Sequence, residues 1–124
     1  MNKARVFLSI ASSIIAVSAV SSVAFAALGF DSSQTYTVVS KTYGDKYASA
    51  LGRTEGNSDT VKAKVYVEIY KNGVFQDSAV SENKGTYAEA QVDVSYDKNG
   101  KYTAKSDHKI WDASGNTKTK TTKG

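Results

Sequence analysis

The residues best suited to chemistry lie together in "SDHKIWD", residues 106–112, which holds the only histidine and the only tryptophan of the chain. His108 follows Asp107, and a histidine oriented by a carboxylate can act as a general base. Neighbouring residues of a strand point to opposite faces of a sheet, however. His108 then shares the inner face with Ile110, while Asp107 and Trp111 point the other way. We expect His108 to be a half-buried structural residue bonded to a backbone carbonyl, and Trp111 to lie outside or at the strand's end.

Other patterns for catalysis or metal binding are weak. The chain has no cysteine and no serine in a Gly-x-Ser-x-Gly motif, so the usual activated nucleophiles are missing. Zinc would need several histidine or cysteine ligands. Asp112, Ser114 and Asn116 alternate as at the start of a calcium loop, but Lys123 stands where the distal glutamate would be. We expect an Asx turn at this place, and we predict no catalytic residue, no metal, no cofactor and no enzyme activity.

The first 26 residues have the three parts of a secretory signal peptide. Lys3 and Arg5 form a basic start, residues 6–23 are apolar or small, and Ala24–Ala26 ("AFA") fits a cleavage site. A membrane anchor is the alternative, because about 18 apolar residues can just span a bilayer. Serines dilute the stretch and no basic cluster follows it. We expect cleavage after Ala26 and a secreted, extracellular protein without stable membrane insertion.

Length and charge limit what the rest of the chain can be. Removing 26 of the 124 residues leaves 98, which is enough for one domain. The formal net charge is +4, and Lys3 and Arg5 supply two of these charges, so the remaining chain carries only +2. This is a weak argument for an anionic partner, and we predict no nucleic-acid binding. A cysteine-free domain must also fold without disulfides, which suits a bacterial exoprotein.

Alternation of apolar and polar residues with period two dominates the chain from residue 35 onward and predicts strands. The clearest case is residues 61–70, where apolar residues begin at Val61 and recur at every second position to form one face. Turns are expected around Gly44-Asp45, Asn72-Gly73 and Asn99-Gly100, since these residue types tolerate tight turns. The expected strands are 35–41, 46–53, 61–70, 74–81, 86–96, 101–111 and, as a last strand or frayed tail, 115–122.

Six or seven strands at this spacing predict an all-β protein, a small antiparallel β-sandwich of the immunoglobulin-like or a similar type. The expected organisation is a signal peptide (1–26), a flexible mature N-terminus (27–34), the sandwich (35–112) and a Lys- and Thr-rich edge strand or tail (113–124). The inner faces are rich in small residues, which predicts a thin core: Ala48, Ala50, Ala63, Ala88, Ala90 and Ala104.

Exposed aromatic residues among lysines are the surface feature most suited to binding. Period-two counting places Tyr66 and Tyr70 on the outer side of one strand, and Lys109 and Trp111 on the outer side of another. Aromatic faces can stack on sugars or bases. We predict that these four residues form a binding site. The leading hypothesis is a secreted, non-enzymatic protein that binds a cell-wall polymer or another surface protein, with an oligomeric state left open.

A second hypothesis comes from a resemblance in general layout. The signal sequence, the short cysteine-free mature chain and the expected sandwich resemble the lactococcin-972-like bacteriocins. This likeness implies an antimicrobial or toxin function. No functional residue is carried over, because the Trp- and Tyr-rich motifs of that family do not align with this sequence. A small hydrolase built on His108 is the third hypothesis.

Overall fold

The computed structural model describes residues 27–42 and 44–124, so the expected signal peptide and its cleavage site lie outside the described residues. The described part contains no helix. Its strands differ from the expected bounds by at most three residues, and the segment expected as a last strand or tail is a strand. They are β2 (Tyr36–Thr42), β3 (Tyr47–Glu55), β4 (Lys62–Lys71), β5 (Val74–Lys84), β6 (Tyr87–Ser95), β7 (Tyr102–Trp111) and β8 (Thr117–Lys123).

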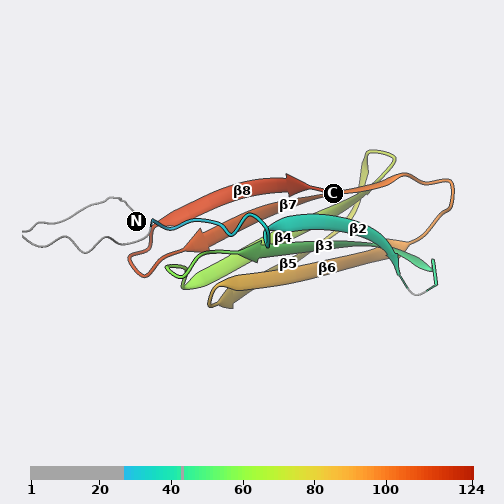
Figure 1. Ribbon diagram of the computed structural model, residues 1–124. Coiled ribbons are helices and arrows are strands. Elements are labelled where there is room, and N and C mark those ends of the chain that lie inside the picture. The colour runs from blue at the N-terminus through green and yellow to red at the C-terminus, as the bar shows by residue number, and fades with distance from the viewer. Residues whose placement is uncertain (1–26, 43) are drawn as a thin grey trace, which may run out of the picture.

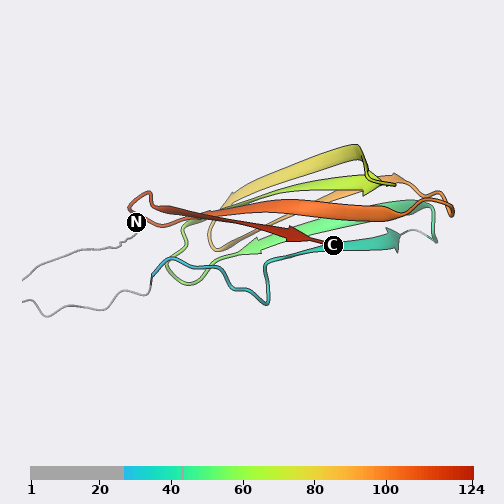
Figure 2. The ribbon, with the colours of Figure 1, turned by 90° about the horizontal axis from the view of Figure 1, so that it is seen from above.

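The strands form two antiparallel sheets, one in the order β2-β3-β6 and the other in the order β5-β4-β7-β8. The chain passes from one sheet to the other between β3 and β4, between β5 and β6, and again between β6 and β7 (Figure 1). The view from above shows β8 running beside β7, with the C-terminus close to β2 (Figure 2). The all-β, antiparallel prediction is confirmed.

The two Asn-Gly turns differ in structure. Asn72 and Gly73 both have positive φ angles, 52° and 80°, and they join β4 to β5 as a tight hairpin. This is the geometry for which Asn-Gly is favoured. Neither Asn99 nor Gly100 has a positive φ angle, and their turn connects two strands of different sheets. There the Asp97 carboxylate accepts the Asn99 N–H at 2.9 Å, so an Asx turn replaces the hairpin turn.

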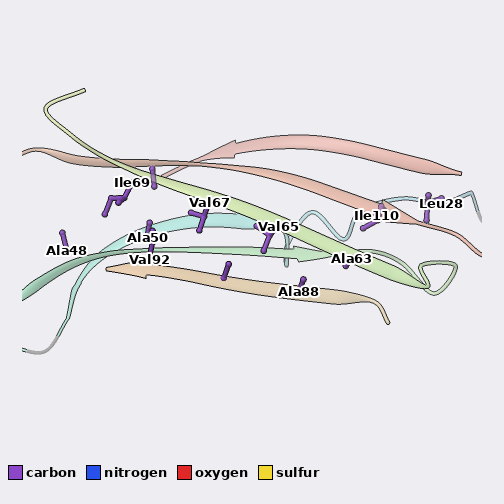
Figure 3. Close-up of a cluster of buried hydrophobic side chains, with 12 residues drawn as sticks. Leu28, Ala48, Ala50, Ala63, Val65, Val67, Ile69, Ala88, Val92 and Ile110 are labelled. Carbon is purple, nitrogen blue, oxygen red and sulfur yellow. The ribbon is translucent and has the colours of Figure 1, made fainter. Parts of the chain in front are cut away.

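Buried alanine, valine and isoleucine side chains from both sheets fill the space between them (Figure 3). All six alanines expected on the inner faces are buried. One expectation for this face is wrong: Val61 is 45% exposed, because β4 begins one residue later, at Lys62. Val65, Val67 and Ile69 are fully buried, as the alternation in β4 predicts.

Residues before β2 also contribute to this core. Leu28 is buried, Phe30 forms an isolated bridge with Gly56, and the Asn57 side-chain amide donates to the Ala27 carbonyl at 2.6 Å. The expectation that residues 27–34 are flexible concerns motion and stays a prediction. Among residues 27–42 and 44–124, no helix is long and apolar enough to cross a membrane.

The two sheets approach each other closely at Gly52. A Cβ atom added to Gly52 would lie 2.6 Å from Ser106 Oγ and 2.8 Å from Val65 Cγ2, both on the opposite sheet. Its Cβ would also lie 3.1 Å from that of Val67. A residue without a side chain is therefore required here by space.

We expect Gly52→Ala to lower the free energy of unfolding by roughly 1–3 kcal/mol, because the added methyl group overpacks a dense core. Denaturant unfolding measures this change. The matched control is Gly29→Ala, whose added Cβ would meet its nearest neighbour at an ordinary 3.6 Å. Equal stability of the Gly52 variant and the wild-type protein would contradict the close approach.

Candidate functional site

The predicted binding residues belong to strands of the four-stranded sheet. We call the solvent side of this sheet the outer face. It consists of residues that alternate with the buried ones: the even-numbered residues 62–70 of β4, the odd-numbered residues 103–111 of β7 and 117–123 of β8, and on β5 Phe75 and the even-numbered residues 78–84. Because the strands are antiparallel and in register, these residues form transverse rows across the sheet.

All four predicted binding residues lie on this outer face, on the adjacent strands β4 and β7. Tyr66 is paired with Asp107, and Lys109 with Lys64. The structure therefore brings Tyr66, Tyr70, Lys109 and Trp111 onto one surface. Their role in binding stays a prediction.

Trp111 lies at one end of the outer face and is half-buried rather than part of the core. Lys62 is directly opposite it, with Nζ 4.2 Å from the centroid of the Trp111 rings, and Lys109 Nζ is 4.9 Å from the same point. An ammonium group within about 6 Å of an aromatic face is attracted to the ring electrons. The tryptophan is therefore a surface residue whose partial cover consists of lysine side chains.

A second cluster lies further along β4. The Tyr70 hydroxyl donates to Glu68 Oε1 at 2.7 Å, the Tyr66 hydroxyl donates to Glu68 Oε2 at 3.0 Å, and Lys105 Nζ lies 3.7 Å from Oε1. The hydrogen bond from Tyr70, followed by that from Tyr66 and the charge of Lys105, holds the pKa of Glu68 below its usual value. The same bond to a carboxylate raises the pKa of Tyr70. Glu68 thus fixes both tyrosine hydroxyls on the sheet.

The two sheets differ in charge. The strands of the four-stranded sheet contain nine lysines and four carboxylates, a net charge of +5. The strands of the three-stranded sheet contain two basic residues and three carboxylates, a net charge of −1. The near-neutral total in the sequence therefore conceals a strongly basic sheet. Sequence reasoning missed this, because the assignment of each strand to a sheet depends on non-local pairing.

His108 lies on the inner side of β7 and is 1% exposed, so the prediction of a half-buried histidine is wrong. The predicted backbone-carbonyl partner is wrong as well. The two ring nitrogens contact threonine hydroxyls: Nδ1 lies 2.7 Å from Thr54 Oγ1 on β3, and Nε2 lies 2.7 Å from Thr122 Oγ1 on β8. The physical reason is that threonines at inward positions of β3 and β8 bring hydroxyl groups to both ring nitrogens.

The hydrogen atoms of this network can be assigned from its partners. The Thr54 hydroxyl donates to the Lys64 carbonyl at 2.8 Å, so it accepts from Nδ1–H of His108. Nε2 then accepts from Thr122, whose oxygen accepts from the Thr37 hydroxyl at 2.6 Å. Every ring nitrogen is satisfied with a neutral imidazole. Burial, together with the charge of Lys120, lowers the pKa of His108 to about 4.

This arrangement leaves His108 no contact with a substrate, and Asp107 points to the opposite face. The Asp112 carboxylate accepts the N–H groups of Ser114 and Asn116, both at 2.9 Å, so the predicted Asx turn is confirmed. Among residues 27–42 and 44–124, no group of three or more His, Cys, Asp or Glu side chains is placed to hold a metal ion.

Comparison with models of known protein families, with curated proteins and with solved structures finds no match. The chemistry of the outer face is therefore the basis on which a function can be proposed.

The buried histidine makes stability depend on pH. Its pKa is about 4 in the folded protein and about 6.5 in the unfolded chain, so the unfolded state gains a proton first as pH falls. The stability that neutral His108 provides is complete above pH 6.5 and is lost progressively as pH falls to 4, by about 3 kcal/mol in total. Urea unfolding across this range measures the loss.

The control for this prediction is His108→Gln, which has no ionisable ring and should show a flatter stability profile in the same window. The pKa values of Glu68, Asp93 and Asp97 are all lowered by hydrogen bonds, which shifts the protonation of these carboxylates away from this window rather than into it. Parallel loss of stability in the wild-type protein and the glutamine variant would contradict the assignment.

The tyrosine cluster gives a second test. We expect Glu68→Gln to lower the pKa of Tyr70 toward its ordinary value, because the accepting carboxylate becomes a neutral amide. A pH titration of the Tyr70 ring signals by NMR measures this. Glu82→Gln on the neighbouring strand should leave the Tyr70 titration unchanged. An unchanged pKa in the Glu68 variant would show that the hydroxyl has another partner.

Proposed function

We propose that this protein is a secreted β-sandwich that acts by binding at the cell surface or outside the cell, and that the outer face of the four-stranded sheet is its contact surface. The observation that carries this proposal is the position of Trp111: an aromatic ring on the outer face with lysine ammonium groups 4.2 and 4.9 Å from its centroid. Tryptophan and tyrosine are among the residues that contribute most binding energy at protein interfaces.

The tyrosine side chains of this face are also held in place before any ligand arrives. Glu68 accepts from both tyrosine hydroxyls. Side chains that are already ordered lose less conformational entropy on binding. Long, paired strands provide a rigid support for them.

Binding rather than catalysis is favoured by the state of His108. A general base needs an accessible ring nitrogen with a pKa near the working pH. Here both ring nitrogens are hydrogen-bonded inside the protein, and the pKa is about 4. A hydrolase that depends on this histidine would need the core to open.

The strand order supports an immunoglobulin-like type of sandwich. In the constant-type immunoglobulin fold, the first, second, fifth and fourth strands form one sheet and the third, sixth and seventh form the other. Here β5, the fourth strand, pairs with β4 instead of β6. The remaining order is the same, so the chain differs from that type by one strand that has changed sheets.

Secretion rests on the basic, apolar and small-residue parts of residues 1–26. A secreted binding domain has two classes of partner within reach, cell-wall polymers and other surface proteins. The antimicrobial hypothesis predicts a zone of killing when the protein is spotted on lawns of related bacteria.

We expect the purified protein to be retained on cell envelopes isolated from the organism that encodes it. Trp111→Ala should weaken retention by roughly tenfold or more, as loss of an aromatic anchor does. The double variant Tyr66→Ala and Tyr70→Ala tests whether the tyrosine cluster also contributes to retention. A co-sedimentation assay with increasing amounts of envelope measures each affinity.

The matched control is Tyr87→Ala. Tyr87 is 49% exposed, with the Arg53 guanidinium 4.5 Å from its ring centroid, but it lies on the three-stranded sheet. Melting curves confirm that all variants are folded. Equal effects of the Trp111 and Tyr87 variants would place the contact surface elsewhere, and absence of retention for the wild-type protein would refute the proposed function.

A further inference from the structure

The end of the outer face around Trp111 concentrates positive charge. Two neighbouring rows contain four lysines and one carboxylate: Lys84, Lys62, Lys64, Lys109 and Glu82. Neighbouring strands lie about 4.8 Å apart and alternate residues of a strand about 6.8 Å apart, so the backbone positions of the four lysines lie within about 10 Å of Trp111. Glu82 is 3.5 Å from Lys62 and neutralises only one of them.

The other end of the face has no such excess. Beyond these two rows the charged residues are Glu68, Lys105, Asp107 and Lys123, two of each sign. Positive charge and the tryptophan therefore coincide at one end. A ligand that uses both must carry negative charge and an apolar ring face within about 10 Å of each other.

We infer that the ligand of the outer face is an anionic sugar polymer, bound at the end that contains Trp111. This inference rests on the proposed function and specifies the ligand of the same surface. Carboxylate or phosphate groups of the polymer pair with the ammonium groups of Lys62, Lys64, Lys84 and Lys109, and the C–H face of one sugar ring stacks on Trp111. Lysine head groups sit on flexible four-carbon stems, so those near the ring can turn toward the charges of the ligand.

Single-stranded nucleic acid is the other polymer that combines negative charge with flat rings, and the face suits it less well. Proteins that bind it without sequence preference use several stacking rings along a basic groove. Here only one end is basic, and the two tyrosine hydroxyls are bound to Glu68. The carboxylates of Glu68 and Asp107 would repel a phosphate backbone that continued along the strands.

The single tryptophan provides a direct readout, because its fluorescence reports on this end of the face alone. We expect titration with polygalacturonate, a polymer of sugar carboxylates, to change the fluorescence of the wild-type protein saturably. Dextran, a neutral glucose polymer, should cause no change. The affinity for polygalacturonate should fall by at least roughly tenfold between about 50 and about 200 mM salt, because several ion pairs form on binding.

Variants distinguish the contribution of the lysine charges to binding from that of the Trp111 ring. Lys64→Ala combined with Lys109→Ala should weaken binding by roughly tenfold and reduce the salt dependence. The matched control is Lys98→Ala combined with Lys101→Ala, which also removes two charges, at exposed positions near the far end of β7. Trp111→Ala should also weaken binding by roughly tenfold, measured by calorimetry because the fluorescent residue is absent, whereas Trp111→Phe should retain most of the affinity.

Each other outcome overturns the inference. Equal binding of inorganic polyphosphate and polygalacturonate, with no effect of Trp111→Ala, would mean that charge alone is recognised. Tighter binding of oligothymidylate than of polygalacturonate would identify a nucleic-acid surface. Retention on envelopes that depends on Trp111, without polygalacturonate binding, would refute the ligand class and leave the proposed function standing. Polygalacturonate binding without envelope retention would refute the proposed function and, because the inference rests on that function, the inference with it.

Discussion

Val65 lies directly across from His108 in the β4–β7 pair, and three residues earlier on β4 Lys62 lies across from Trp111. This one antiparallel register determines which residues of β4 and β7 lie in the core and which lie on the outer face. It brings the histidine under the three-stranded sheet and the tryptophan beside the lysines. A slip of one residue would exchange the two faces of the shifted strand, putting Lys64 of β4 or Lys109 of β7 in the core. The proposed contact surface and the core are therefore two sides of the same pairing.

The polar centre of the core helps to specify that register. The chain of hydrogen bonds from Lys64 through Thr54, His108 and Thr122 to Thr37 joins five strands from both sheets. A buried polar group without its partners is costly, so any register that separates these residues is penalised. A core of mainly alanine and valine side chains discriminates less between registers by shape alone. We regard specificity, rather than added stability, as the main effect of this network.

Charge is distributed by the same topology. Residues 27–124 together carry a net charge of only +2, yet the strands of one sheet sum to +5 and those of the other to −1. Because the sheets lie back to back, an approaching anion meets one basic surface rather than the average of the sequence. Folding gathers most of the lysines on one sheet and so strengthens the electrostatic attraction of that sheet for anions.

Period two by itself determined the strands of this protein and the face on which most side chains lie. Tyr66, Tyr70, Lys109 and Trp111 were placed on outer faces by counting, because side-chain direction alternates with every residue of a strand. The expected face of Val61 was wrong, since the exact start of a strand depends on pairing that local alternation does not record.

Only the tertiary structure decided which strands share a sheet, and with that the contacts across strands. The threonine partners of His108 lie 54 and 14 residues from it along the chain, and Lys62 lies 49 residues from Trp111. Such pairs are selected by the burial and hydrogen bonding of the whole domain, which a local sequence pattern does not contain. The sequence therefore identified the tryptophan as a surface candidate, and the pairing of strands supplied the lysines around it.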